Sequence, residues 1–328
     1  MCFGPGCQAG CASARREARY YAATPSPRSH CILNHSAALR ACEKSVDLLR
    51  TPNFSQPLSR TPLLDTTAAI AFAAVGAAAG LFAGLLGIGG GAVMVPALLL
   101  LLPAFDMGGT WTAHQAVATS LATVVAAGSA SALSHHRRGA VQWVLVRRLV
   151  PSLLAGAACG ALVAGWLPGF WLKRLFGLFL LASGARMLLA RPASTKPRPL
   201  PDNRLLSAGG AGIGALSAVL GIGGGIMIVP YLARHGVALR NAVATSSACG
   251  VPLALAGSIG FVLSGWGRGG LAPHSLGFVL WPAVLAIAAA AMPMANVGAR
   301  LAHRLPTVAL RRVFALFLLV VGLRLLLG

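Results

Sequence analysis

Two stretches of the chain share one glycine-rich sequence: GLFAGLLGIGGGAVMVP at residues 80–96 and GALSAVLGIGGGIMIVP at residues 214–230. Each lies in a long apolar run, from Thr66 to Leu102 and from Leu205 to Leu232. Because consecutive glycines carry no side chains, we expect a helix to unwind there and to expose its backbone N–H groups. In a membrane such a break is tolerated only where it is buried in protein or lines a cavity. The stretches therefore predict two broken membrane helices.

The composition is that of a chain that crosses a bilayer several times. Hydrophobic residues make up 56% of it and charged residues only 10%, whereas soluble domains carry about a quarter charged residues. Several apolar runs approach the ~20 residues that a spanning helix needs. The expected segments are residues 66–102, 112–133, 149–167, 175–190, 205–232, 242–263, 276–297 and 313–327. We predict an all-α integral membrane protein with about eight transmembrane segments, and the lipid bilayer as its surroundings.

Two further pairs of stretches match between the halves of the chain. Residues 115–122 (QAVATSLA) correspond to residues 241–248 (NAVATSSA), and residues 172–189 correspond to residues 310–327. Three motifs in the same order indicate an internal duplication, which is frequent in transporters. The expected division is a first transmembrane repeat at residues 64–190, a basic proline-rich linker at 191–204 and a second repeat at 205–328.

The N-terminal residues 1–63 differ from the rest of the chain. They hold five of the seven cysteines, together with many Arg, Ser and Pro residues. They lack the uninterrupted apolar core of a secretory signal, and their cysteine spacing is a weak match to a metal site. We expect a disordered tail or an extension from a misassigned start, and no metal or other cofactor.

The net charge of +21 raises the question of a nucleic-acid partner. The cations, however, lie at the ends of apolar segments, as in the cytoplasmic loops of membrane proteins. We therefore expect no nucleic-acid binding. The six acidic residues all lie outside the apolar segments, so a core without carboxylates suits an anion better than a cation. Any titration within the membrane would fall to histidine or to the substrate, and among the histidines His114, beside Gln115, is the one to watch.

Loop charge also predicts how the two halves are oriented. The basic loops at residues 134–148 and 191–204 are separated by two spans, so both can be cytoplasmic. The basic loop at 296–312 joins them on that side only if the broken run at 205–232 returns to the side where it began. This arrangement makes the two halves inverted repeats.

The glycine breaks and the two Ala-Thr-Ser motifs supply the candidate binding residues. A half-helix that begins after each break would direct its positive end toward the break, which favours an anion. Residues four apart share a helix face, and neutral donors can hold an oxyanion without the cost of a buried charge. The alternatives are close helix packing by the glycines and interhelical hydrogen bonds by the hydroxyls. The candidate substrate-binding residues are Gly87, Gly89, Gly90, Gly91, Gln115, Thr119, Ser120, Gly221, Gly223, Gly224, Gly225, Asn241, Thr245 and Ser246.

These paired elements carry a resemblance to a known family. The two LGIGGG elements followed by Pro96 and Pro230, the two AVATS segments and the four-plus-four layout resemble the TauE/SafE sulfite exporter family of permeases, over residues 65–328. The resemblance implies a transporter in the plasma (inner) membrane of a prokaryote. It also implies a substrate among sulfite, organosulfonates and related sulfur oxyanions.

The expected function is a secondary carrier of a small anion that works by alternating access. The lysine that follows the glycines of a nucleotide-binding loop is missing from both stretches. Energy would come instead from the membrane potential, about 2.3 kcal/mol per charge per 100 mV, or from a proton gradient. The alternatives are an anion channel and a non-transporting membrane assembly subunit. We expect no enzyme, since the apolar segments offer no nucleophile–base pair, and a homodimer is compatible with the sequence.

Overall fold

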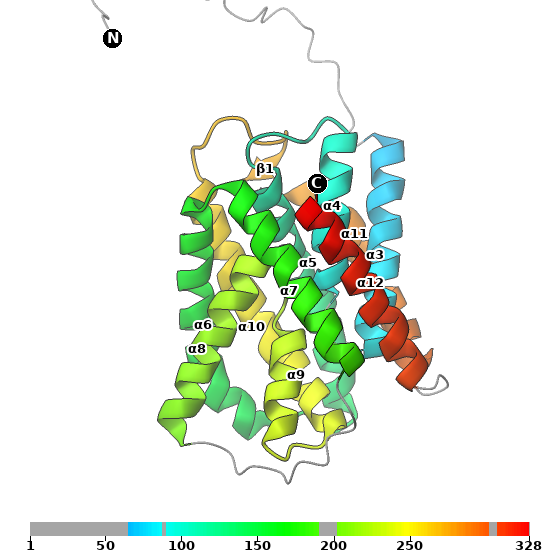
Figure 1. Ribbon diagram of the computed structural model, residues 1–328, viewed down its shortest axis with the longest axis vertical. Coiled ribbons are helices and arrows are strands. Elements are labelled where there is room, and N and C mark those ends of the chain that lie inside the picture. Colours follow the sequence, from blue (N-terminus) through cyan, green and yellow to red (C-terminus); the bar gives the residue numbers. More distant parts are fainter. Residues whose placement is uncertain (1–64, 87–89, 190–201, 302–306, 328) are drawn as a thin grey trace, which may run out of the picture. The chain divides into compact units, whose positions relative to one another are not determined.

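A computed structural model of the chain describes residues 65–86, 90–189, 202–301 and 307–327. The predicted tail at residues 1–63, most of the linker, and the candidate residues Gly87 and Gly89 lie outside the described residues. Helices make up nearly all of the described chain (Figure 1). They are α3 (Thr66–Leu86), α4 (Gly91–Ala104), α5 (Thr112–Arg137), α6 (Trp143–Trp166), α7 (Gly169–Leu189), α8 (Asn203–Leu220), α9 (Gly225–Arg234), α10 (Leu239–Gly265), α11 (Trp281–Leu301) and α12 (Thr307–Leu327), with two short strands, β1 (Ser275–Leu276) and β2 (Val279–Leu280).

Five of the described helices are long and apolar enough to cross a membrane, namely α3, α5, α6, α10 and α11. Helices α4, α8 and α9 are apolar but shorter, because the glycine breaks divide each predicted long run into two helices. Helices α7 and α12 have 21 residues each but carry three cations apiece. The chain is therefore an all-α, multi-pass membrane protein.

Several predicted boundaries are wrong by a few residues. Helices α6, α7 and α12 begin earlier than expected, at Trp143, Gly169 and Thr307, because cations near these starts lower the local hydropathy without ending the helix. The helix expected from residue 276 begins only at Trp281, after a hairpin in which β1 pairs with β2. Gly277 makes the hairpin turn with φ of 55°, a conformation that glycine adopts without steric cost.

Helices from the two halves pack against each other in matching pairs. Helix α3 packs on α11 and α8 packs on α6, while α5 contacts α10 and α7 contacts α12. Gly80 lies directly against the backbone of Ala291, and Gly214 lies in the same way against Leu153. Small residues allow membrane helices to approach closely. At these two crossings there is no room for a Cβ, so glycine is required by packing.

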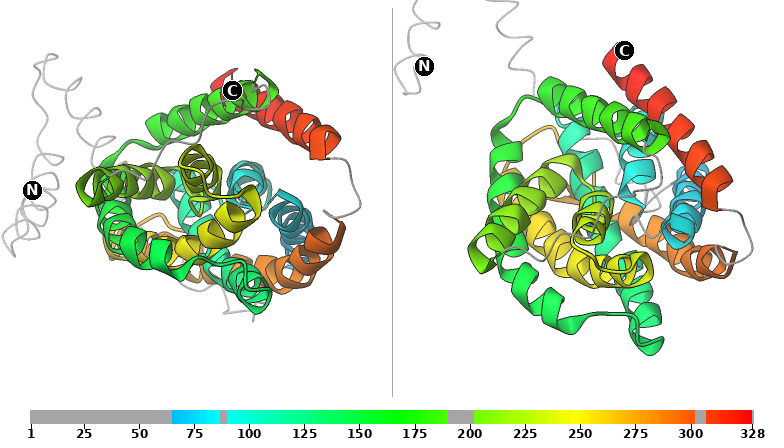
Figure 2. Two further views of the ribbon diagram at one scale, coloured as in Figure 1. Left: turned by 90° about the horizontal axis from the view of Figure 1, so that it is seen from below. Right: turned by 60° about the horizontal axis from the view of Figure 1, so that its bottom comes forward.

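The bundle has two ends with different loops (Figure 1). The hairpin end contains β1, β2 and the loop before them, together with the start of α5 and the C-terminus. The linker end contains the end of α7 and the starts of α8 and α10. The first broken run, α3 and α4, begins at the hairpin end and returns to it. The second broken run, α8 and α9, begins at the linker end and returns to that end. Figure 2 looks from the linker end and shows α7 and α12 together along one side of the other helices.

Candidate functional site

Helix α5 carries most of the buried polar side chains among the described residues. Its buried polar positions are Thr112, His114, Gln115, Thr119, Ser120 and Thr123, and none of them exposes more than 8% of its surface. Buried polar groups in proteins are almost always hydrogen-bonded. The partners of these side chains therefore define what each of them does.

Thr119 and Thr245 make matching hydrogen bonds between the halves. The backbone N–H of Leu280 donates to Oγ1 of Thr119 at 3.1 Å, and the N–H of Gln142 donates to Oγ1 of Thr245 at 3.1 Å. Each donor directly precedes a helix, α11 or α6. Each threonine thus fixes the start of a helix from the other half. Interhelical hydrogen bonding of this kind is the alternative to substrate binding that the sequence left open for these hydroxyls.

Gln115 and Asn241, one turn before these threonines, have different surroundings. The side-chain amide of Gln115 donates to Oγ of Ser275 at 3.1 Å, which ties α5 to β1. Asn241 is half-buried near the start of α10, at the linker end. The structure gives no further contact that distinguishes Asn241 as a binding residue.

The second glycine break lies against both α5 and the start of α4. Gly221 ends α8 in the left-handed region, with φ of 70°. Its carbonyl accepts a hydrogen bond from Oγ of Ser120 at 2.9 Å. A Cβ placed on Gly91 would lie 2.7 Å from the same carbonyl oxygen and 3.0 Å from Cα of Ile222. The first half-helix therefore begins packed directly on the second break.

Both half-helices begin after a glycine of the same conformation. Gly90 precedes α4 with φ of 67° and ψ of −20°, and Gly224 precedes α9 with φ of 78° and ψ of −17°. This left-handed region costs other residues roughly 1–2 kcal/mol. The first N–H groups of each half-helix have no acceptor within the helix and carry partial positive charge. Each break thus presents backbone that favours an anion.

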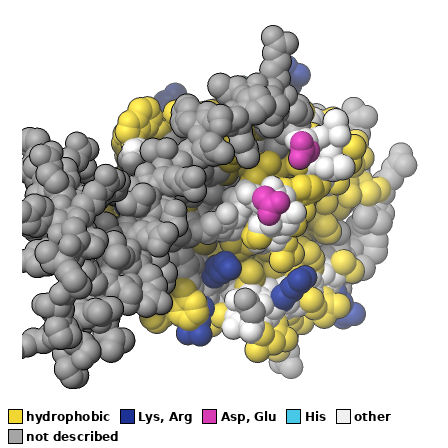
Figure 3. Space-filling view, turned by 90° about the horizontal axis from the view of Figure 1, so that it is seen from above, with side chains coloured by type: hydrophobic (Ala, Val, Ile, Leu, Met, Phe, Trp, Pro, Cys, Tyr) yellow, Lys and Arg dark blue, Asp and Glu magenta, His cyan; other side chains and the backbone are white. Residues whose placement is uncertain are grey.

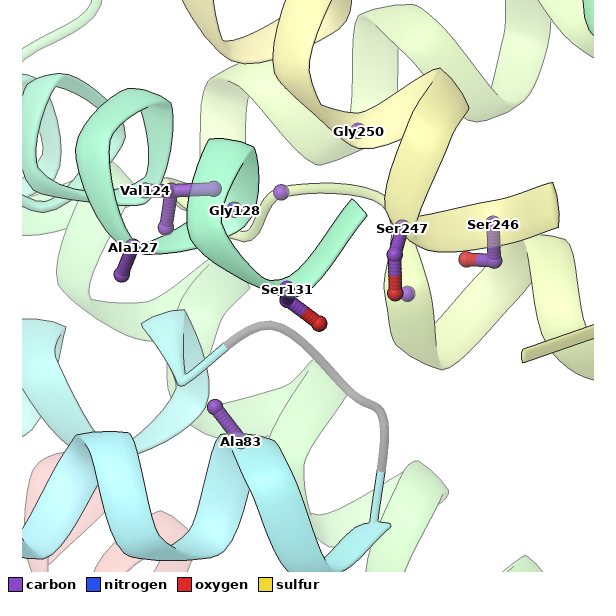
Figure 4. A pocket seen from close by; sticks show the side chains of 10 residues that line it. Ala83, Val124, Ala127, Gly128, Ser131, Ser246, Ser247 and Gly250 are labelled. Carbon is purple, nitrogen blue, oxygen red and sulfur yellow. The ribbon is translucent and has the colours of Figure 1, made fainter. Parts of the chain in front are cut away.

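A cavity of about 30 Å³ lies at the start of α9 (Figure 4). Ser131 of α5 and Ser247 of α10 lie on opposite sides of it, and Ala83 of α3 lies below. Ser246 also lines the cavity. It exposes 1% of its surface, and its Oγ has no hydrogen-bond partner among the described residues.

The structure brings part of the predicted site to this cavity and leaves part of it elsewhere. Gly223, Gly225 and Ser246 line the cavity. Thr119, Ser120, Thr245 and Gln115 are hydrogen-bonded to protein groups outside it, and Gly90, Gly91, Gly221 and Gly224 shape the two breaks.

Sequence reasoning missed the lining residues Gly128 and Ser131 of α5. A signal for them exists, because Ser131 lies about three helical turns beyond Ser120 and so shares its face. The signal is weak because many other residues in this part of α5 are small as well.

The hairpin end of α5 is closed by aromatic and cationic contacts. The indole N–H of Trp111 donates to the carbonyl of Gly269 at 3.2 Å. The guanidinium carbon of Arg268 lies 4.6 Å from the centre of the Trp111 ring, and the ring of His114 stacks on Phe278 at 5.0 Å. Together these contacts hold the loop before β1 against the start of α5.

His114, which the sequence singled out, belongs to this closed end. Its Nε2 lies 3.1 Å from the carbonyl oxygen of Ala164 and 3.0 Å from that of Leu167. Both partners can only accept, so Nε2 carries the proton. Its Nδ1 is buried without a partner among the described residues. The histidine therefore ties α5 to the turn between α6 and α7.

The similarity to known proteins covers the part of the chain that forms the helical bundle. The model of the sulfite exporter TauE/SafE family matches residues 72–325, which contain all the candidate site residues. A probable membrane transporter protein of Haemophilus influenzae is 37% identical over 251 residues, covering 76% of this chain and 94% of that protein.

More distant relatives cover similar shares. A probable membrane transporter protein of Methanocaldococcus jannaschii is 30% identical over 258 residues, covering 77% of this chain and 93% of that protein. The probable membrane transporter protein YdhB of Bacillus subtilis is 27% identical over 254 residues, with 75% and 96% covered. No solved structure matches the chain.

Proposed function

Because the chain belongs to the sulfite exporter TauE/SafE family, we propose that it is a secondary transporter of a small anion, with sulfite or a related sulfur oxyanion or organosulfonate as its substrate. One observation carries the proposal. At the start of α9 the backbone of a glycine break meets a buried serine hydroxyl, that of Ser246, which has no partner among the described residues.

The cavity offers neutral donors to an anion. The first N–H groups of α9, at Gly225 and Ile226, have no acceptor within the helix and lie at its positive end. The hydroxyls of Ser246 and Ser247 can donate alongside them. No charged side chain is among the described residues that line the cavity. Because neutral donors leave no uncompensated charge when the site empties, such a site can release its anion as well as bind it.

The contacts at the hairpin end favour a carrier over a channel. There Trp111 and His114 hold the start of α5 against the loop before β1 and the turn between α6 and α7. A movement of α9 would open the cavity at the second break while these contacts keep the hairpin end closed. Access from one side at a time is what alternating access requires.

We propose that the two halves are inverted repeats around this cavity. The matched contacts of Gly80 with Ala291 and of Gly214 with Leu153 support the proposal. The exchanged hydrogen bonds of the two threonines support it as well. So does the path of each broken run, which returns to its own end (Figure 1). Inverted repeats allow one half to take up the conformation of the other, so that the open and closed ends exchange.

The charges favour the linker end as the cytoplasmic side of a prokaryotic inner membrane. Exposed cations of the linker end include Arg137, Arg138, Arg147, Arg148, Arg204, Arg234 and Arg240. The part of the hairpin end that is uncovered in Figure 3 shows acidic side chains as well as cations among hydrophobic side chains. Cytoplasmic loops are enriched in Lys and Arg. Since Gly128 and Ser131 lie in the half of α5 nearer the linker end, the cavity belongs to the cytoplasmic half.

The experiment is flux of labelled sulfite into proteoliposomes that hold the purified protein, with and without an imposed membrane potential. A carrier gives saturable, potential-sensitive flux that accelerates when unlabelled sulfite is present on the other side. Flux that does not saturate and shows no such acceleration would instead identify an anion channel. Absence of flux for sulfite, thiosulfate and organosulfonates alike, under every gradient, would contradict the proposal and favour an assembly subunit.

A further inference from the structure

A second and larger cavity lies at the hairpin end, with a volume of about 570 Å³. Its walls come from the end of α4, the start of α5, the start of α7 and the end of α12. Pro103, Phe170 and Leu326 form apolar parts of the wall, and Lys173 and Arg174 supply two adjacent cations. The proposed transport site uses none of these residues.

The charged side chains among the described residues that line this cavity are both cations. Lys173 is half-buried, and the guanidinium carbon of Arg174 lies 4.0 Å from the centre of the Phe170 ring. No acidic side chain is among the described residues that line it. A cation held against apolar surface loses part of its hydration and gains from an anionic partner. The cavity is therefore suited to a ligand with a negative group and an apolar part.

The position of the cavity is that of the membrane–water boundary. Phe170, Trp171, Trp166 and Trp266 lie at the hairpin end and expose 55%, 52%, 82% and 67% of their surfaces. Exposed tryptophans and other aromatic side chains mark the depth of the lipid headgroups. An anionic phospholipid, which has a negative headgroup at this level and apolar acyl chains, fits that description.

The packing of α7 and α12 leaves a groove that lipid can reach. These helices pack mainly on each other, and their contacts with α4, α5 and α8 are few (Figure 2). The lining residue Leu327 exposes 80% of its surface at the end of α12. The cavity thus lies between this pair and the rest of the bundle, where an acyl chain could follow the apolar wall.

We propose that this cavity binds one anionic phospholipid from the membrane leaflet at the hairpin end. Its phosphate lies between Lys173 and Arg174, with Arg174 suited to hold two phosphate oxygens at once. Its acyl chains pack against Pro103 and Leu326. The bound lipid joins the α7–α12 pair to the start of α5. The inference does not depend on which anion the protein transports.

The test is native mass spectrometry of the purified, delipidated protein after titration with phosphatidylglycerol. The Lys173→Gln/Arg174→Gln variant removes both cations. The matched control is Arg147→Gln/Arg148→Gln, a pair of adjacent exposed cations on α6 outside the cavity. We expect the wild type and the control to bind one lipid tightly and the cavity variant to bind it at least tenfold more weakly. Melting curves of all proteins check that they are folded.

A second variant tests the shape of the cavity independently of its charge. Thr110 is exposed and lines the cavity, so Thr110→Trp fills the space while both cations remain. We expect this variant also to lose the lipid. Equal binding by the wild type and both cavity variants would overturn the proposal. So would equal binding of phosphatidylcholine, or full displacement of phosphatidylglycerol by millimolar inorganic phosphate, which would make the cavity a site for free anions.

Discussion

The two glycine breaks share the sequence GIGGG, at residues 87–91 and 221–225, and their described parts share one backbone conformation, but their surroundings differ. Gly91, which begins the first half-helix, packs on the carbonyl of Gly221. Gly225, which begins the second, lines a cavity. Ser120 has an acceptor in Gly221, whereas its counterpart Ser246 has none among the described residues. A repeated sequence thus repeats the local conformation, while tertiary packing decides which copy lies beside a cavity.

Filling the cavity at the second break gives the largest expected effect. A Cβ on Gly128 would make only ordinary contacts with Val251 and Val124, at 3.4 and 3.8 Å. The rest of a leucine side chain would then occupy the cavity. We expect Gly128→Leu to reduce sulfite flux to the background of empty liposomes while the protein remains folded.

The matched control for this variant is Gly212→Leu. Gly212 is an exposed position on α8, and a Cβ there would meet nothing within 4 Å. Flux through the control should equal that of the wild type, as measured in the same proteoliposomes. Undiminished flux through Gly128→Leu would show that the second break is not the open one, and the comparison of the two breaks would lose its functional meaning.

The conformation that the breaks share can be tested at the glycine before each half-helix. We expect Gly90→Ala and Gly224→Ala each to lose about 1–2 kcal/mol of stability, because both residues have a left-handed backbone. The contacts of the added Cβ differ: at Gly90 it would lie 3.1 Å from the backbone oxygen of Ala79, and at Gly224 it would lie 2.8 Å from Cδ1 of Ile228, a side-chain end that can move. Thermal unfolding in detergent measures both changes.

Gly212→Ala is the reference for these two variants. It should be neutral or slightly stabilising, since alanine favours a helix over glycine by about 1 kcal/mol. If Gly90→Ala or Gly224→Ala is as stable as Gly212→Ala, the result would contradict a left-handed backbone conformation at that glycine.

The two serines distinguish the breaks most directly. Ser120→Ala removes the donor to the carbonyl of Gly221, so we expect a loss of about 1 kcal/mol in stability. Ser246→Ala removes a hydroxyl that bonds to no described residue, so stability should hardly change. Its loss should instead raise the KM for sulfite roughly tenfold, the effect of one hydrogen bond to a charged ligand. Melting curves and the concentration dependence of flux separate the two effects, and the reverse assignment would contradict the comparison.

Much of this arrangement could be predicted from the sequence, and what could not has physical causes. The helices and the glycine breaks follow from hydropathy and from glycine-rich motifs, which depend on neighbours along the chain. The start of α11 was missed because Leu276 is as apolar as a helical residue, although it pairs with Val279 in a strand. The hydrogen bond from Leu280 to Thr119 joins residues that are 161 positions apart. No local pattern reveals such a contact.

The candidate site shows the same limit at single residues. The sequence treats Thr119, Ser120, Thr245 and Ser246 alike, because all four are hydroxyls in matching motifs. In the structure three of them bond to protein groups, and the fourth, Ser246, bonds to none of the described residues. That difference depends on which backbone groups reach each side chain in the folded bundle. The role of these residues in binding therefore stays a prediction, now narrowed to Ser246.

The two threonines give the smallest expected effect on sulfite flux, and they show most directly what the two halves share. Each accepts one backbone N–H, from Leu280 or Gln142, at the same distance of 3.1 Å. Thr119→Val and Thr245→Val keep the shape of the side chain and leave a backbone N–H without its acceptor, so each should cost about 1–3 kcal/mol of stability. Thr119→Ser and Thr245→Ser keep the acceptor and should cost less.

Equal losses at the two threonines, beside unequal effects at the two serines, would mean that the halves share their scaffold and differ only at the breaks. Thermal unfolding of the four threonine variants measures the first part of this statement. A KM for sulfite that rises in Thr119→Val or Thr245→Val but not in Ser246→Ala would contradict the assignment of the threonines to the scaffold and of Ser246 to the binding site. Substrate would then bind at the exchanged hydrogen bonds, which would have to open during transport, and the cavity at the second break would be a packing defect between α5, α9 and α10.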